Sequence, residues 1–132
     1  MINVKHVLLI DDDPIANFIN ARLIKTTCRT EEISQIKNGN EALTFLTTLY
    51  QQQAPCPDLI FLDINMPVMD GFEFLGEFKK LKFINHDTLK VVILSTSSYY
   101  ADVEKFLLYG IQDFIIKPLT PAKLNSILQK LW

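Results

Sequence analysis

The strongest structural signal in the chain is the stretch Pro57-Asp58-Leu59-Ile60-Phe61-Leu62-Asp63-Ile64-Asn65-Met66-Pro67. Its four consecutive apolar residues, 59–62, predict a short strand that is buried on both faces, as in a parallel sheet. Met66-Pro67 and then Asp70-Gly71 mark a loop after this strand, which places Asp63 at the strand's carboxyl end. Ligands of open α/β sheets bind in the crevice outside those ends, so Asp63 is a candidate site residue.

Strands and helices are predicted to alternate five times along the chain. Continuous apolar runs predict strands at residues 7–10, 59–62, 91–94 and 114–116, and a weaker pattern predicts a short or edge strand at 32–36. A helical pattern follows each strand, which favours βαβ units with right-handed crossovers around a parallel sheet. The predicted fold is therefore an α/β, flavodoxin-like (βα)5 three-layer sandwich with strand order 2-1-3-4-5.

Each predicted helix carries apolar residues at helical spacing, which we expect to face the sheet. In chain order they are Ile15, Phe18, Ile19 and Leu23; Ala42, Phe45, Leu46 and Leu49; Phe74, Leu75, Phe78 and Leu81; Val103, Phe106 and Leu107; and Leu124, Ile127, Leu128 and Leu131. Asp13 is placed to cap the first helix ahead of Pro14, and Thr120 to cap the last ahead of Pro121. Gly110 is placed to end the fourth helix.

Length and composition predict one domain over residues 1–132, with no output domain after it. The net charge of −2 implies no strongly basic face, so direct binding to nucleic acid is not expected. The apolar runs are far shorter than the ~20 residues of a membrane span, and the N-terminus lacks a signal peptide's apolar core. We therefore expect no membrane insertion and a cytoplasmic location, where Cys28 and Cys56 would remain thiols.

Charged and polar side chains follow the predicted strands at the points where they end. The first strand is followed by Asp11, Asp12 and Asp13, the third by Asp63, the fourth by Ser95 and the fifth by Lys117. The strand order 2-1-3-4-5 makes the first and third strands neighbours, which would bring Asp11, Asp12 and Asp63 within a few ångströms of one another. Carboxylates at that range repel one another unless they are protonated or neutralised.

A divalent cation is the simplest neutraliser of such a cluster, and hard oxygen ligands on loops suit Mg²⁺. Lys117 would add an ammonium and Ser95 a hydroxyl, which completes a set of groups able to handle a phosphoryl group. One carboxylate must then act as the nucleophile and form an acyl phosphate. Asp63 is the best placed, on the central strand between the acidic cluster and Lys117.

Each of these features alone has a plain structural explanation. The residues 11–13 are also consistent with a helix cap beside solvated neighbours, Asp63 with a turn residue and Lys117 with a solvated lysine. Their joint position at the strand ends of one sheet makes that explanation the weaker one.

The residues also resemble a known family over essentially the whole chain. Val7-Leu8-Leu9-Ile10-Asp11-Asp12-Asp13, Leu62-Asp63-Ile64-Asn65-Met66-Pro67-Val68-Met69-Asp70-Gly71, Leu94-Ser95 and Phe114-Ile115-Ile116-Lys117-Pro118 resemble the response-regulator receiver domain of two-component signalling. The resemblance implies that Asp63 accepts a phosphoryl group from a phosphohistidine on a sensor histidine kinase or a histidine phosphotransfer protein. It implies a phosphoprotein of a phosphorelay, not an enzyme beyond promoting its own phosphorylation and dephosphorylation.

The same resemblance implies a role for each matching position. Asp11, Asp12 and Asp63 would hold Mg²⁺ together with the backbone carbonyl of Asn65, while Asp13 would only cap a helix. Lys117 would contact the phosphoryl oxygens, and its bond to Pro118 would be cis. Ser95 stands where the family has the Ser or Thr that moves to hydrogen-bond the phosphoryl group.

Phe114 occupies the position of the family's switch aromatic, which is often Tyr, and without a hydroxyl it is expected to favour burial. Asn65 and Ser97 stand where the family tunes hydrolysis of the acyl phosphate. The readout face would be the fourth helix, fifth strand and fifth helix, with the aromatics Tyr99, Tyr100, Tyr109 and Phe114. The signal would pass to a separate effector protein, from a monomer or a phosphorylation-dependent dimer.

Two other functions stay open. Asp11-x-Asp13 after an apolar strand faintly resembles haloacid-dehalogenase-type phosphatases, in which Asp11 would be the nucleophile, although the block around Asp63 would then have no role. An inert pseudo-receiver would keep the fold without the chemistry, which the presence of Asp11, Asp12, Asp63, Ser95 and Lys117 argues against. A flavodoxin is disfavoured, because an acidic pocket repels a flavin phosphate.

Overall fold

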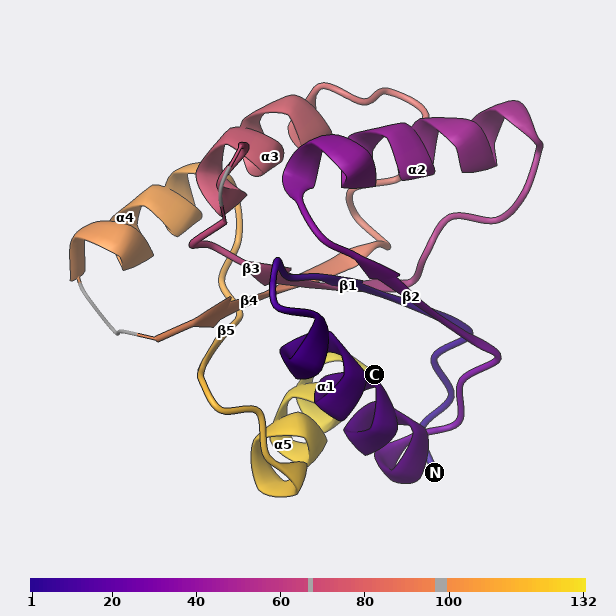
Figure 1. The fold of residues 1–132 in the computed structure, drawn as a ribbon, viewed down its shortest axis with the longest axis vertical. Coiled ribbons are helices and arrows are strands. Elements are labelled where there is room, and N and C mark those ends of the chain that lie inside the picture. The colour runs from indigo at the N-terminus through magenta and orange to yellow at the C-terminus, as the bar shows by residue number, and fades with distance from the viewer. Residues whose placement is uncertain (67, 97–99) are drawn as a thin grey trace.

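The computed structural model describes residues 1–66, 68–96 and 100–132 and shows one parallel sheet between two layers of helices (Figure 1). The strands are β1 (His6–Ile10), β2 (Glu32–Ile36), β3 (Leu59–Asp63), β4 (Lys90–Ser95) and β5 (Phe114–Ile116). The helices are α1 (Pro14–Thr27), α2 (Gly39–Gln51), α3 (Gly71–Lys79), α4 (Tyr100–Leu108) and α5 (Pro121–Leu131). The strand order β2-β1-β3-β4-β5 confirms the predicted fold.

The register of the sheet aligns the carboxyl ends of its central strands. Ile10 pairs with Leu62, Asp63 with Leu94, and Ser95 with Ile116. The residues that follow β1, β3 and β4 therefore meet at a single rim, as the strand order predicts.

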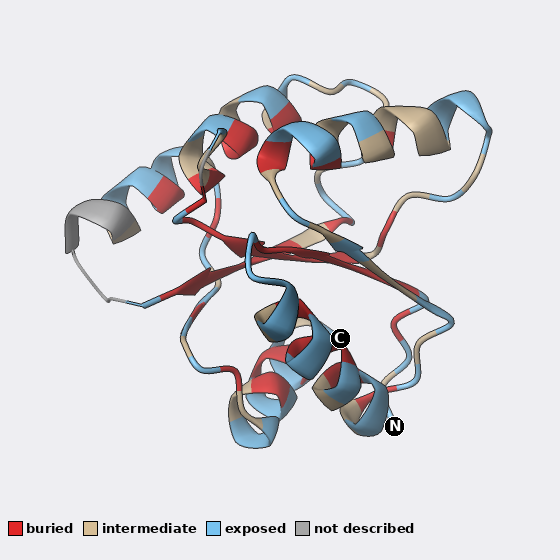
Figure 2. Ribbon diagram, in the orientation of Figure 1, coloured by how far each residue is buried: buried red, intermediate tan, exposed pale blue. Residues whose placement is uncertain are grey.

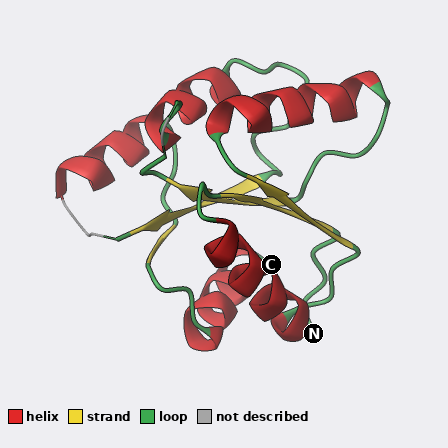
Figure 3. Ribbon diagram, in the orientation of Figure 1, coloured by secondary structure: helices red, strands yellow, loops and turns green. Residues whose placement is uncertain are grey.

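The two faces of the sheet bury separate apolar clusters. Helices α2, α3 and α4 cover one face, and α1 and α5 cover the other (Figures 1 and 3). The first cluster includes Leu8, Leu62, Phe74 and Phe106, and the second includes Leu9, Phe61 and Leu128. Because alternate residues of β1 and β3 enter opposite clusters, these strands are apolar throughout, which explains their unbroken hydrophobic runs.

Helix starts and ends follow the local chemistry of the sequence. The side chain of Asp13 accepts a hydrogen bond from the amide of Ile15, and that of Thr120 from the amide of Lys123. Asp70 and Glu73 form a reciprocal capping box at the start of α3. Gly110 has a φ of 75°, a backbone conformation that favours glycine after a helix end.

Of the four α1 residues predicted to face the sheet, Leu23 packs against the second apolar cluster, but the prediction is wrong for the other three. Ile15, Phe18 and Ile19 are 68%, 56% and 56% exposed, and α1 instead buries Asn17, Asn20, Ala21 and Ile24. The side-chain amide of Asn17 on this buried face donates 2.9 Å to the carbonyl of Asp11, and Ala21 and Ile24 on the same face join the second apolar cluster. Figure 2 shows the outward surface of α1 as exposed.

Leu107 in α4 is also exposed, contrary to prediction, whereas Phe106 beside it is buried. Among the described residues, no helix is both long and apolar enough to cross a membrane.

Candidate functional site

Three carboxylates converge at the carboxyl rim of the sheet. Asp11, Asp12 and Asp63 each offer an oxygen, and these oxygens lie within 4.8 Å of one another. Asp11 and Asp63 are buried, while Asp12 is exposed. The pairing of Ile10 with Leu62 produces this meeting, because Asp11 and Asp63 are the residues that follow that pair.

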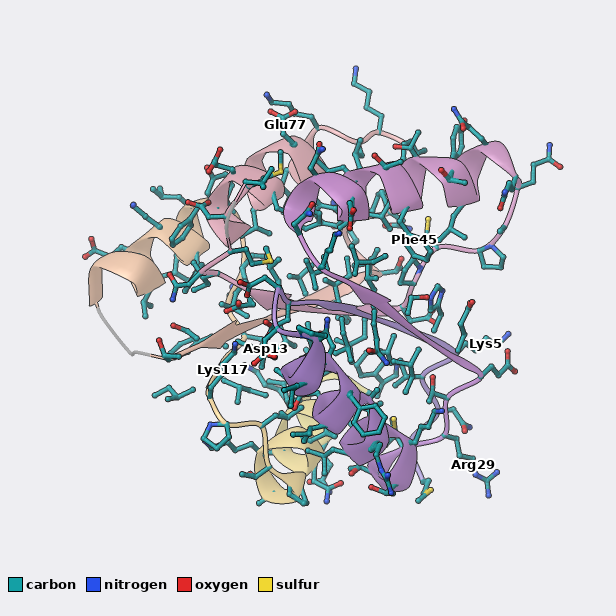
Figure 4. The ribbon with its side chains drawn as sticks, in the orientation of Figure 1. Lys5, Asp13, Arg29, Phe45, Glu77 and Lys117 are labelled. Atoms are coloured by element: carbon teal, nitrogen blue, oxygen red, sulfur yellow. The ribbon has the colours of Figure 1, made fainter. Side chains whose placement is uncertain are left out.

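Lys117 joins this cluster from the end of β5. Its Nζ lies 3.0 Å from Oδ2 of Asp11 and 3.2 Å from Oδ1 of Asp63. Its backbone amide donates a 2.7 Å hydrogen bond to the carbonyl of Ser95, which ties the Lys117 loop to the end of β4. The bond from Lys117 to Pro118 is cis, as predicted. In Figure 4, Lys117 and Asp13 lie beside each other at this rim.

Burial and charge shift the ionisation of the two central groups. The pKa of Asp63 is raised to about 6 by burial and by the charge of Asp11, which together outweigh the opposing effects of Lys117 and of a hydrogen bond from the amide of Asn65. Burial alone would lower the pKa of Lys117, but its hydrogen bond with Asp11 and the charges of Asp11 and Asp63 raise it above the ordinary value. Lys117 is therefore a cation at neutral pH.

The donor set fits a hard divalent cation. Three carboxylates against one ammonium leave an excess of negative charge at neutral pH, and carboxylate oxygens are the ligands that Mg²⁺ prefers. Asn65 is exposed, and its amide donates to Asp63. A role for the Asn65 carbonyl as a ligand stays a prediction.

The other predicted site residues fall in different places. Asp13 caps α1 as predicted, and its amide donates 2.9 Å to Asp11, which helps to orient that carboxylate. Ser95 is buried at the end of β4, one residue after Leu94, which pairs with Asp63 on β3. Ser97 and Tyr99 lie outside the described residues, as does the side chain of Tyr100.

Two of the predicted readout aromatics differ from expectation. Phe114 is 37% exposed, because outward-facing Phe114 and Ile116 flank inward-facing Ile115 on the edge strand β5. Tyr109 packs against the first apolar cluster near Gly76 of α3, so it does not join Phe114 on an outer face.

Sequence reasoning missed the tight contact at Gly71. Its amide donates 2.9 Å to the carbonyl of Ile64, and a Cβ at this position would lie 2.8 Å from the Ile64 Cα. The signal was present as Asp70-Gly71, but it was interpreted only as a loop marker. The start of α3 is thus pressed against the backbone that follows Asp63.

Comparison with known proteins agrees with this geometry. The family model described as "Response regulator receiver domain" matches residues 7–129. The two-component response regulator ORR41 of Oryza sativa subsp. japonica is 31% identical over 125 residues, which cover 94% of this chain and 91% of that protein. The chain spans only about half the length of two C4-dicarboxylate response regulators that it also matches.

Solved structures share the fold of this chain. A two-component response regulator from Cytophaga hutchinsonii has a TM-score of 0.85 and 36% identity, with 98% of this chain and 97% of that one covered. The receiver domain of the Arabidopsis thaliana histidine kinase CKI1, solved with Mg²⁺, has a TM-score of 0.81 and 25% identity, with 97% and 92% covered. Together with the acidic rim and its lysine, these matches show that the chain belongs to the response regulator receiver domain family of two-component signalling.

Proposed function

We propose that Asp63 accepts a phosphoryl group from a phosphohistidine on a sensor histidine kinase or a histidine phosphotransfer protein. The observation that carries the proposal is the position of the Lys117 ammonium, which contacts both Asp11 and Asp63 at the rim of the sheet. A cation held against the acceptor carboxylate can neutralise the negative charge of the oxygens of an incoming phosphoryl group.

The transfer breaks the nitrogen–phosphorus bond of the donor and forms an oxygen–phosphorus bond at an Asp63 carboxylate oxygen. The donor imidazole leaves with the electron pair of the broken bond. Lys117 and the hydroxyl of Ser95 hydrogen-bond the phosphoryl oxygens. Asp11, Asp12, Asp63 and the Asn65 carbonyl would hold Mg²⁺, which supplies charge neutralisation for the phosphoryl group when bound.

The donor is proposed to bind beside the outer face of α1. Ile15, Phe18 and Ile19 are exposed there, and Ile15 and Ile19 line a groove of about 440 Å³ that also includes Lys117 and Pro118. The groove is therefore continuous with the phosphoacceptor rim. The Arg22 guanidinium lies 5.8 Å from the Phe18 ring centroid, and Lys25 is in the last turn of α1, so the matching donor surface is apolar with an acidic border.

The output is proposed to be a shift between two arrangements of the elements around Ser95 and Phe114. A separate effector would bind the face formed by α4, β5 and α5, where Phe114 and Ile116 are exposed, and the protein would act as a monomer or as a phosphorylation-dependent dimer. The proposal includes a cytoplasmic location and no catalysis beyond gain and loss of its own phosphoryl group.

Asp11 is the weaker candidate for the nucleophile. One of its oxygens accepts from the amide of Asp13 and the other contacts Lys117, which occupies both oxygens with partners. The phosphatase alternative would place the phosphoryl group on Asp11 and leave the sequence block around Asp63 without a role.

Incubation with acetyl phosphate and Mg²⁺, followed by intact mass measurement, tests the proposal. We expect the wild type to gain one phosphoryl group. The adduct should not form when EDTA is present in the reaction, nor on Asp63→Asn. Peptide mapping of the phosphorylated protein then identifies the acceptor. A phosphoryl group on Asp11 would favour the phosphatase alternative, and no adduct at all would favour an inert pseudo-receiver.

A further inference from the structure

We propose that a clasp between α3 and α4, formed by Phe72, Lys105 and Phe106, sets the position of α4 and thereby regulates phosphorylation at Asp63. This inference rests on the proposed function and names a regulatory contact for that site. The clasp is a feature of this chain's own side chains: one aromatic ring at the start of α3 and two consecutive residues of α4.

The clasp consists of two contacts to the same ring. The rings of Phe72 and Phe106 stack, with centroids 5.0 Å apart and an interplanar angle of 19°. The Lys105 Nζ lies 4.9 Å from the Phe72 centroid, within the range of a cation–π contact. Phe106 is 3% exposed, so the stack anchors the inner side of α4, whereas Lys105 is exposed.

Phe72 is tied to the phosphoacceptor by the backbone. It follows Gly71, whose amide donates to the Ile64 carbonyl and whose missing Cβ allows contact with the backbone of Asp63 and Ile64. A movement of the segment after Asp63 must therefore move Gly71 and with it the Phe72 ring. The route from the acceptor to α4 is contiguous and only a few contacts long.

Phe114 is poorly suited to couple α4 to the site, which makes the route through the clasp more important. A switch aromatic with a hydroxyl can exchange one hydrogen bond for another, but Phe114 carries no such group and is 37% exposed in the structure. The clasp instead joins α4 to the β3–α3 side of the site. The clasp is closed in the same arrangement in which Lys117 pairs directly with the Asp63 carboxylate, a contact that a phosphoryl group on Asp63 would replace. Part of the proposal is that the clasp favours this arrangement.

Linkage then gives the direction of the effect. A contact that favours the unmodified arrangement opposes phosphorylation, and its removal must favour phosphorylation by the same factor. Mg²⁺ binding to the carboxylates should change little, since the clasp contacts none of them.

The experiment measures the apparent affinity for beryllofluoride, a mimic of the phosphoryl group, in the presence of saturating Mg²⁺. Lys105→Met removes the charge and keeps the stem at an exposed position, and Phe72→Leu removes the ring. We expect each variant to bind beryllofluoride about two- to tenfold more tightly than the wild type. Amide hydrogen exchange should report weaker protection of α4 in both variants without beryllofluoride.

Two matched controls remove similar contacts far from the acceptor. Phe83→Leu breaks the stack of Tyr50 with Phe83, whose centroids are 4.4 Å apart, and Lys79→Met removes a cation 5.9 Å from the Phe78 ring. Both controls should bind beryllofluoride as the wild type does.

Unchanged or weaker binding by Lys105→Met, with wild-type Mg²⁺ affinity, would overturn the clasp proposal even if Phe72→Leu does not fold. In that case the wild type still binds beryllofluoride, and the proposed function stands. A wild type that neither binds beryllofluoride nor accepts a phosphoryl group would overturn both proposals.

Discussion

At the amino end of the sheet, the buried His6 has a polar partner for its amide and for each ring nitrogen. At the carboxyl end, the buried Asp63 lies close to a second carboxylate, that of Asp11. The His6 amide donates 3.0 Å to Asp58, its Nε2 lies 2.8 Å from the Ser34 hydroxyl, and its Nδ1 lies 3.4 Å from Glu32. Burial lowers the pKa of His6 despite the charges of Glu32 and Asp58, so the ring is neutral at neutral pH. Burial and Asp11 raise the pKa of Asp63 to about 6, so its carboxylate is mostly charged there.

The difference distinguishes a buried polar residue that stabilises the fold from one that is suited to binding and reaction. A buried group that is neutral and hydrogen-bonded stabilises its surroundings and needs nothing more. A buried group that stays charged, beside like charges, retains an unfavourable free energy that a bound cation can release. The two ends should therefore respond oppositely to pH and differently to the removal of partners.

The largest expected effect is that of Lys117→Met, which leaves Asp11 and Asp63 buried without their cation. We expect the free energy of unfolding to fall by about 2–4 kcal/mol at pH 7.5, measured by urea denaturation. The control is Lys130→Met, which removes the exposed ion pair with Asp113 and should cost less than about 1 kcal/mol. Equal losses in the two variants would contradict the view that the rim depends on this lysine.

The next effect has the opposite sign. Asp63→Asn should raise the free energy of unfolding by about 2–3 kcal/mol at pH 7.5, because it removes a charge whose pKa is higher in the folded chain than in the unfolded one. Such a group contributes stability below its unfolded pKa of 3.8 and loses that contribution as the pH rises through about 6. The gain should therefore vanish near pH 4.

Asp12→Asn is the matched control for Asp63→Asn, since Asp12 belongs to the same cluster but is exposed. Its effect on stability should be within about 0.5 kcal/mol of zero. A gain as large as that of Asp63→Asn would assign the stabilisation to repulsion within the cluster and not to burial of Asp63.

Addition of Mg²⁺ should have an intermediate effect. At about ten times its dissociation constant, a ligand that binds only the folded chain stabilises it by about 1.4 kcal/mol. The increase in melting temperature should be larger at pH 8 than at pH 5, because protonation of Asp63 near pH 6 competes with the metal. The same increase at both pH values would argue that Mg²⁺ binds elsewhere, and its persistence in Asp63→Asn would agree with that conclusion.

The strands of the sheet and the residues at its carboxyl end could be predicted from the sequence. The continuous apolar runs of β1, β3 and β4 predicted buried parallel strands, and the residues that end them predicted the meeting of Asp11, Asp63 and Lys117. The strand order brings Asp11 and Asp63 together, because it makes β1 and β3 neighbours.

What the sequence could not provide is which face of an element turns inward. Helical periodicity groups Ile15, Phe18 and Ile19 on one side of α1, but the buried side carries Ala21 and Ile24, which pack in the second apolar cluster, together with Asn17, which contacts the Asp11 carbonyl. The preference of an apolar Phe114 for burial was likewise outweighed by strand alternation on the short edge strand β5. Both outcomes depend on neighbours that are distant in the sequence or on a register that no local pattern contains.

The smallest effect is expected at the amino end. His6→Gln should change the free energy of unfolding by less than about 1 kcal/mol at pH 7.5, because only neutral hydrogen bonds are replaced. A base whose pKa is lowered by folding loses stability as the pH falls below its unfolded value of 6.5, so the wild type should weaken relative to His6→Gln between about pH 6.5 and the lower folded pKa. Over the same range, Asp63 makes the wild type more stable as the pH falls. Denaturation profiles of the wild type and both variants between pH 4 and 8 measure the two slopes, and slopes of the same sign would show that the two ends do not bury their charges differently.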